Sequence, residues 1–233
     1  MQLPPIYNTD NKHPNFSVVE KWLGHVFDHV NIEKRIASKE KNILSLRRQY
    51  RMNEKICKLI NKYFYSGNLI TDKSVKSDKK YPKILNDNLI IVDTASANPF
   101  SVFQPTRYSK TNTLHACAVR NLCIYLKDNK VIEDVTSVGV ATPYKAQQIL
   151  LKDLMKEWNL HEHIVTGTVH TYQGDQKRIM IFDIPDSEGT QPSKLINSAS
   201  TLDSGSKLLN VAFSRSKDIL IVSIFFDSKI LLS

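Results

Sequence analysis

The chain contains two kinds of apolar segment, and each kind predicts a different secondary structure. Short runs rich in Val, Ile and Leu predict buried strands, because they are shorter than a typical helix. These runs are residues 43–46, 88–93, 138–142, 164–169, 179–184 and 219–225. Longer segments repeat apolar residues three and four positions apart, which predicts amphipathic helices. These segments are residues 16–30, 53–65, 115–126, the stretch that begins at Pro143, and 207–216.

The order of these elements predicts the fold class. Strands that alternate with amphipathic helices form a mostly parallel sheet with helices on both faces, which is an α/β architecture. The intervening segments are polar. Ser66-Gly67-Asn68 is typical of a helix end, and residues 73–83 predict an exposed lysine-rich loop. Residues 98–112 predict an irregular stretch, and residues 186–206, rich in Ser, Gly, Asp and Thr, predict a mobile insertion.

The composition is that of a basic globular protein. The 233 residues carry a formal net charge of +9, and 41% of them are hydrophobic. This charge fits a polyanionic partner such as nucleic acid, and it fits equally a basic protein that is merely soluble. No apolar run approaches the roughly 18 residues of a membrane helix, and residues 1–5 do not resemble a signal peptide.

The cysteines predict neither disulfides nor a metal site. Cys57, Cys117 and Cys123 form no even set and show no metal-ligand spacing. Free cysteines are among the residues most often buried in a core. We therefore interpret them as reduced core residues of a cytoplasmic protein, or of a nuclear one in a eukaryote.

Polar residues follow two of the predicted strands. Thr142-Pro143-Tyr144 follows one strand, and residues 170–176 follow another. Ligands on open parallel sheets bind at the carboxyl ends of the strands. We therefore expect both clusters at that edge of the sheet.

Arg51 and Arg215 are the candidate catalytic residues. Arg51 lies in Gln49-Tyr50-Arg51-Met52, between a predicted strand and a helix, where its planar donor fork can contact a phosphate. Arg215 is predicted to lie in the helix 207–216, whose apolar face anchors it to the sheet. Such an arginine can stabilise the charge that develops on a transferring phosphoryl group, an effect worth on the order of 10³ to 10⁵ in rate.

Residues around the predicted strand ends supply further candidate contacts. Gly174 permits close approach of the backbone to a ligand. Thr168 and His170 offer donors to phosphates, and no nearby nucleophile or metal set supports His170 as a catalytic acid or base. Thr142 stands at a helix N-terminus, which favours anions. Tyr144 can stack on a base or be a half-buried tyrosine, and the sequence leaves both readings open.

Taken together, these stretches resemble the C-terminal part of a superfamily 1B helicase. Gln2-Leu3-Pro4-Pro5 resembles the end of motif III, and Gln49 to Met52 resembles motif IV. Thr142 to Gln147 resembles the T-P-Y-x-x-Q element, Gly167 to Gln176 resembles motif V, and Leu209 to Lys217 resembles motif VI. The elements occur in the order of the family and span nearly the whole chain.

The resemblance implies a RecA-like three-layer fold and an ATP site shared by two such domains. Residues 1–41 would be the end of motif III and a short tail of the first domain, and residues 42–233 would be the second domain. Gln2, Arg51 and Arg215 would approach the γ-phosphate of ATP, and Gly174 and Gln176 would lie near the ribose. Single-stranded nucleic acid, DNA in preference to RNA, would run along Thr142, Tyr144, Thr168 and His170.

Three departures from the family pattern stand out. Gln176 replaces the glutamate of Q-G-x-E, which is expected to weaken a bond to a ribose hydroxyl. His115 follows Ser109-Lys110-Thr111-Asn112 where relatives have a glutamate. No G-x-x-x-x-G-K-[ST] sequence and no Asp-Glu pair occur, so the groups that hold ATP and Mg²⁺ are absent from these residues.

We therefore expect the chain to be part of a larger ATP-dependent helicase whose other RecA-like domain binds ATP and Mg²⁺. By itself the chain is expected to bind no cofactor tightly, no metal and no membrane, and not to hydrolyse ATP. The alternative is a stand-alone module that binds nucleic acid or a partner and has lost ATPase function. An unrelated Rossmann-like enzyme has little support, because no G-x-G-x-x-G sequence follows a strand.

Overall fold

The computed structural model describes residues 35, 38, 46–77, 79–190 and 204–225. The chain divides into two compact units, Gln2–Arg47 and Arg48–Ser233, with Met1 counted in the second. The predicted helix 16–30, most of the predicted strand 43–46, and Gln2 fall outside the described residues. The description below therefore concerns the second unit, and the assignment of residues 1–41 to another domain stays a prediction.

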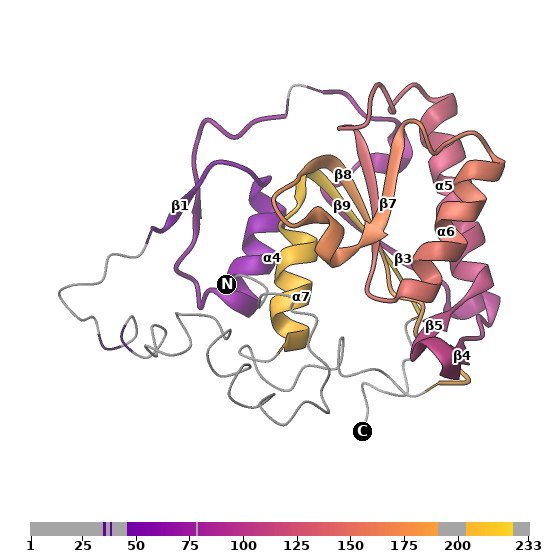
Figure 1. The fold of residues 1–233 in the computed structure, drawn as a ribbon. Helices are drawn as coiled ribbons and strands as arrows, with labels where there is room; N and C mark the ends of the chain where they lie inside the picture. The colour runs from indigo at the N-terminus through magenta and orange to yellow at the C-terminus, as the bar shows by residue number, and fades with distance from the viewer. Residues whose placement is uncertain (1–34, 36–37, 39–45, 78, 191–203, 226–233) are drawn as a thin grey trace. The chain divides into compact units, whose positions relative to one another are not determined.

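A five-stranded parallel sheet lies at the centre of this unit (Figure 1). Its strand order is β3 (Leu89–Asp93), β9 (Ser216–Ile224), β8 (Lys177–Asp183), β6 (Val138–Thr142) and β7 (Ile164–Thr168). Every pairing within it is parallel. A short parallel pair joins β1 (Arg48–Gln49) to β2 (Ile70–Thr71), and an antiparallel hairpin joins β4 (Val102–Gln104) to β5 (Ser109–Thr111).

Helices cover both faces of the sheet, which makes three layers. Helices α5 (Thr113–Asp128) and α6 (Lys145–Glu157) lie on one face, and α4 (Glu54–Phe64) and α7 (Ser204–Phe213) lie on the other (Figure 1). Short 3-10 turns complete the connections at Lys83–Leu85, Ala95–Ala97, Pro105–Arg107 and Val169–Tyr172. The predicted RecA-like α/β fold with helices on both faces is confirmed.

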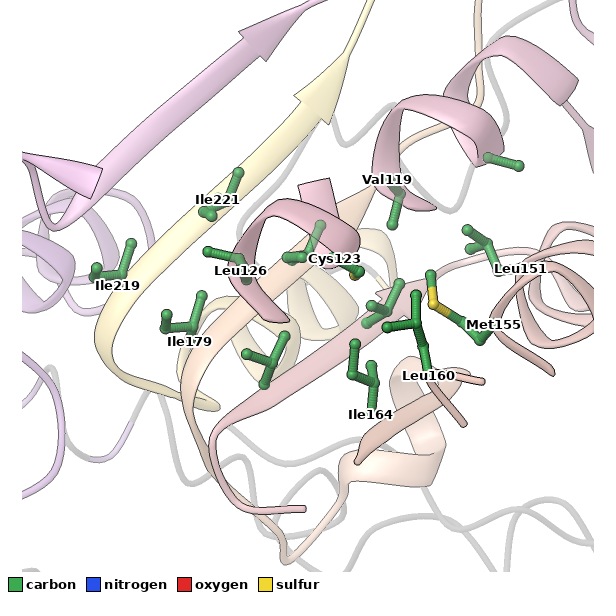
Figure 2. Close-up of a cluster of buried hydrophobic side chains, with 14 of the residues drawn as sticks. Val119, Cys123, Leu126, Leu151, Met155, Leu160, Ile164, Ile179, Ile219 and Ile221 are labelled. Carbon is green, nitrogen blue, oxygen red and sulfur yellow. The ribbon is translucent and has the colours of Figure 1, made fainter. Parts of the chain in front are cut away.

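The main core fills the layer between the sheet and helices α5 and α6 (Figure 2). Ile179 and Ile181 of β8 belong to this cluster, whereas the intervening side chains point to the opposite face, as the two-residue period of a strand requires. On that opposite face Phe182 packs edge-to-face on Phe213 of α7, with ring centroids 5.5 Å apart. Alternation along one strand therefore supplies apolar residues to both layers.

Local signals fix the ends of the helices. The Asn53 side chain caps α4 by accepting a hydrogen bond from the Lys55 backbone N–H at 3.0 Å. Asn112 caps α5 in the same way, through the His115 N–H at 3.1 Å. After α4 the backbone turns to positive φ at Ser66 and Gly67. The predicted helix 53–65 and its end are therefore confirmed.

Two predictions about segments were wrong. The strand 88–93 was expected to be buried, but β3 is an edge strand of the sheet and Ile91 is 62% exposed. Residues 98–112 were expected to be irregular, but they contain the β4–β5 hairpin, whose strands are too short for their sequence period to be recognised.

Two further predictions, at the end of the chain, also need correction. Arg215 does not lie within a helix, because α7 ends at Phe213 and Arg215 stands in the turn before β9. The start of the predicted mobile insertion 186–206 is packed in place, since Ser187 is buried and its hydroxyl lies 2.9 Å from that of Ser101. Residues 191–203 lie outside the described part of the chain.

Candidate functional site

The structure separates the predicted site residues into sets at two opposite edges of the sheet. Thr142 and Thr168 end neighbouring strands and are paired in register, so they lie at the carboxyl edge. Arg215 directly precedes β9, and Gly174 and Gln176 precede β8, so these residues lie at the amino edge. The expectation that residues 170–176 cluster at the carboxyl edge was therefore wrong for the second half of that segment.

Arg51 joins the amino edge through contacts with residues far away in the sequence. The backbone N–H of Asn53 donates to the Lys217 carbonyl at 2.7 Å, which holds the start of α4 beside the start of β9. The Arg51 guanidinium donates to the Ser214 carbonyl at 3.4 Å. The Arg215 guanidinium donates to the Asp175 carbonyl at 3.3 Å. The structure thus brings both candidate arginines to one place.

The electrostatics of this place favour an anion. Partial burial, and then the positive charge of Arg51, lower the pKa of Arg215 from its usual range. The Arg215 Nε is buried without a hydrogen-bond partner. Among the described residues neither guanidinium forms an ion pair with a carboxylate. Two cations held together with an unsatisfied donor are stabilised by an anionic group that accepts from both.

A lysine–aspartate pair supports Arg215 from below. The Lys177 ammonium contacts Asp175 at 2.9 Å; the lysine side chain is buried and the aspartate half exposed. The hydrogen bond from Lys177 is the main cause that lowers the pKa of Asp175. Because Asp175 also accepts from Arg215 through its carbonyl, the pair fixes the backbone on which the arginine rests. Sequence reasoning missed this pair, although both residues lie within motif V or adjoin it.

Gly174 and Gln176 flank this pair at the surface. Gly174 has φ +91°, and nothing lies within 4 Å of the position a Cβ would take. The glycine is therefore required by its backbone conformation, and the space above it is open. Gln176 is half buried, and its backbone N–H donates to the Asp175 carboxylate at 2.7 Å.

At the carboxyl edge the predicted nucleic-acid residues differ in exposure. Thr142 is fully buried, and its hydroxyl has no hydrogen-bond partner. Thr168 is half buried and His170 is exposed. Partial burial of its ring lowers the pKa of His170, so near neutral pH the imidazole is mainly neutral. His170 and Thr168 are therefore the accessible members of this set.

Tyr144 does not present a free ring face. It is 4% exposed, its hydroxyl donates to Asp186 at 2.6 Å, and the Lys110 ammonium lies 5.4 Å from its ring centroid. The reading of Tyr144 as a base-stacking residue does not fit this burial, and the half-buried alternative is closer to what the structure shows. Its place beside the nucleic acid stays a prediction.

A buried polar network connects the hairpin, α5 and α6 to the end of β8, and sequence reasoning missed it. His115 Nδ1 lies 3.0 Å from Asp183, and His115 Nε2 lies 2.8 Å from the Thr94 hydroxyl. The Gln147 amide donates to Asp183 at 2.7 Å and to the Asn112 carbonyl at 3.1 Å. Signals were present, since Gln147 ends the T-P-Y-x-x-Q element and His115 is the departure noted above.

The described part of the chain offers no group of three or more His, Cys, Asp or Glu side chains placed to hold a metal ion. Within the same residues no helix is long and apolar enough to span a membrane. Gln2, which was expected at the nucleotide, lies outside the described residues. The three cysteines are free, and Cys57 and Cys123 are buried.

Comparisons with known proteins agree with the motif pattern. A family model described as an AAA domain matches residues 28–224. The probable helicase senataxin of Mus musculus is 26% identical over 140 residues, which cover 60% of this chain and 5% of that protein. An uncharacterized ATP-dependent helicase of Methanocaldococcus jannaschii is 26% identical over 189 residues, 77% of this chain and 26% of its own length.

A further relative is the DNA replication ATP-dependent helicase/nuclease DNA2 of Gallus gallus, 25% identical over 191 residues. These cover 81% of this chain and 17% of that protein, so the chain spans about a quarter or less of the relatives named here. Among solved structures, the C-terminal domain of a possible DNA helicase from Lactobacillus plantarum is 10% identical with a TM-score of 0.44, and it covers 76% of this chain and 88% of that one. The helicase nonstructural protein 10 of an Arterivirus is 14% identical with a TM-score of 0.35, covering 78% and 26%.

Proposed function

The chain belongs to the AAA-domain family as a RecA-like domain of a superfamily 1 helicase, and from this premise we propose that it is the second motor domain of an ATP-dependent nucleic-acid helicase. Its role is to complete an ATP site whose phosphate-binding loop and magnesium ligands belong to another RecA-like domain. The observation that carries this proposal is the convergence of Arg51 and Arg215 at the amino edge of the sheet.

The two arginines act on the γ-phosphate in different ways. Arg215 is half buried and braced by the Asp175 carbonyl, so its guanidinium is held in place before a phosphate arrives. Arg51 is exposed and rests only on the Ser214 carbonyl, so it has more freedom to adjust. A braced arginine stabilises the charge of the transition state without first being reorganised. We therefore assign the larger contribution to Arg215.

The remaining residues position the nucleotide and the strand. Gly174 leaves open space beside the arginines, and Gln176 supplies an amide for the ribose hydroxyls. Thr168 and His170 contact the backbone of a single strand at the opposite edge, with DNA preferred over RNA. Hydrolysis of ATP supplies the free energy for closure and reopening of the two domains. Since β7 and the segment 169–176 connect both edges, movement at one edge reaches the other through this segment.

The test is ATP hydrolysis by the full-length product of the gene, with and without single-stranded DNA. Loss of an arginine finger costs on the order of 10³ to 10⁵ in rate, or roughly 4 to 7 kcal/mol of barrier. We expect Arg215→Ala to fall in this range and Arg51→Ala to lose less. Arg120→Ala is the matched control, because Arg120 lies on α5, on the other face of the sheet, over the Trp158 ring.

The possible outcomes separate the hypotheses. DNA-stimulated hydrolysis that survives Arg215→Ala would overturn the finger assignment. No hydrolysis by a folded full-length protein would favour the binding module over the motor. Residues 1–233 by themselves are proposed to be inactive, and magnesium-dependent turnover by this chain that Arg215→Ala abolishes would refute that.

A further inference from the structure

The tip of the β4–β5 hairpin exposes aromatic side chains that the core does not use. Phe103 is 46% exposed and Tyr108 is 88% exposed. Their rings meet edge-to-face with centroids 6.5 Å apart and an interplanar angle of 70°. They therefore pack on each other at the surface and leave ring faces open to solvent.

The base of the same hairpin is anchored by polar contacts. The Ser109 hydroxyl accepts from the Ala146 backbone N–H at 2.9 Å, at the first turn of α6. The Lys110 ammonium forms a buried ion pair with Asp186. The Asn112 amide donates to the Ser187 hydroxyl at 3.0 Å. The hairpin is thus a stiff support, and its aromatic tip is held rather than loosely attached.

These anchors also place the hairpin at the carboxyl edge of the sheet. Helix α6 follows directly from Thr142, the last residue of β6, and Ser109 contacts the start of that helix. Thr142 is paired with Thr168 of the edge strand β7. The aromatic tip therefore belongs to the same edge of the sheet as the proposed strand contacts Thr168 and His170.

The backbone at Tyr108 is strained. Its φ of 45° and ψ of 46° lie in the left-handed region, which is an outlier for a bulky aromatic residue. Strain of this kind persists where the surroundings impose it, and it is concentrated at functional sites. A tyrosine that is almost fully exposed gains little from packing, so folding does not account for its presence in this conformation.

The charges around the tip fit a nucleic acid as its occupant. Lys145 is exposed at the start of α6, and Arg107 adjoins Tyr108 in the sequence. The acidic neighbour Asp186 is neutralised by Lys110, which leaves the exposed Glu188 as the acidic residue closest to the hairpin along its backbone contacts. The chain carries a formal net charge of +9.

We propose that Phe103 and Tyr108 form a stacking platform for the bases of single-stranded nucleic acid, beyond the phosphate contacts of Thr168 and His170. This inference rests on the proposed function. Aromatic side chains bind bases of any sequence, because every base offers a π-face. The platform accounts for the exposed rings, the stiff support and the strained tyrosine together.

The experiment is fluorescence anisotropy with the 233-residue chain and labelled oligothymidine, beside an abasic oligonucleotide of the same length. Phe103→Ala and Tyr108→Ala are each expected to weaken oligothymidine binding about tenfold, which is about 1.4 kcal/mol. Neither is expected to change the affinity for the abasic strand. Tyr108→Trp, which keeps an aromatic ring, should retain the affinity, and Tyr63→Ala removes an equally exposed ring from α4 as a control.

Each result has one meaning. Equal binding of both oligonucleotides, unchanged by the variants, would show phosphate contacts only and overturn the platform while leaving the motor proposal intact. The same loss in Tyr63→Ala would also overturn it, because the effect would not be specific to the hairpin. No binding of either strand by the folded chain would overturn the platform, and ATP hydrolysis by the full-length protein would then decide the motor proposal separately.

Discussion

Replacing Asp183 by alanine tests how far the buried polar network stabilises the fold. Asp183 is fully buried at the end of β8. One carboxylate oxygen lies 3.0 Å from His115 Nδ1, and the other accepts from the Gln147 amide at 2.7 Å. Alanine removes both acceptors and leaves water little access to the donors. The donors on α5 and α6 would then be buried without this partner.

The expected magnitude follows from the partners that remain. A buried donor left unpaired costs about 1–3 kcal/mol. The Gln147 amide still donates to the Asn112 carbonyl at 3.1 Å, so its loss falls at the low end. His115 Nδ1 has no other hydrogen-bond partner among the described residues, so its loss falls higher. We expect Asp183→Ala to lower the free energy of unfolding by about 3 kcal/mol in total.

The assay is urea-induced unfolding followed by circular dichroism, with the free energy obtained by linear extrapolation. Asp153→Ala is the matched control, because Asp153 is exposed on α6 and such substitutions change stability by about 0.5 kcal/mol or less. A double-mutant cycle with His115→Ala isolates the pair, and we expect a coupling of about 1–2 kcal/mol. A loss no larger than that of Asp153→Ala, or additive single losses, would refute the reasoning.

Three further predictions use the same measurements of stability. Tyr172→Phe removes the hydroxyl that accepts from the Val140 N–H at 3.0 Å, and it should cost about 1–2 kcal/mol in urea unfolding. Hydrogen bonds from Ser74, ahead of the one from Arg48, hold the pKa of Asp72 at about 2, below its ordinary 3.8. Its contribution is therefore complete above pH 3.8 and lost as the pH falls toward 2, and acid titration of Asp72→Asn should lack this component. Tyr108→Gly should raise the free energy of unfolding by about 0.5–1 kcal/mol while it weakens oligothymidine binding, and a loss of stability would contradict the strain argument.

Much of the fold could be predicted because its signals are local. The strand 138–142 agrees residue for residue with β6, since a run of buried apolar residues is bounded by polar ones on both sides. Asn53 marks the start of α4 and Ser66-Gly67 its end, because capping and positive φ depend on neighbouring residues only. The edge position of β3 could not be predicted, since the order of strands in a sheet is not encoded in any one of them.

The site shows the same division. The sequence by itself determined the α/β fold, the motif order and the identity of Arg51 and Arg215 as the residues able to contact phosphate. Only the tertiary structure decided that a contact spanning 163 residues brings Arg51 to the turn that carries Arg215, and that this place is the amino edge of the sheet. It also decided that Tyr144 is buried and that Phe103 and Tyr108 are exposed. The physical reason is that exposure and juxtaposition depend on which distant segments pack together, whereas periodicity and capping depend on neighbours along the chain.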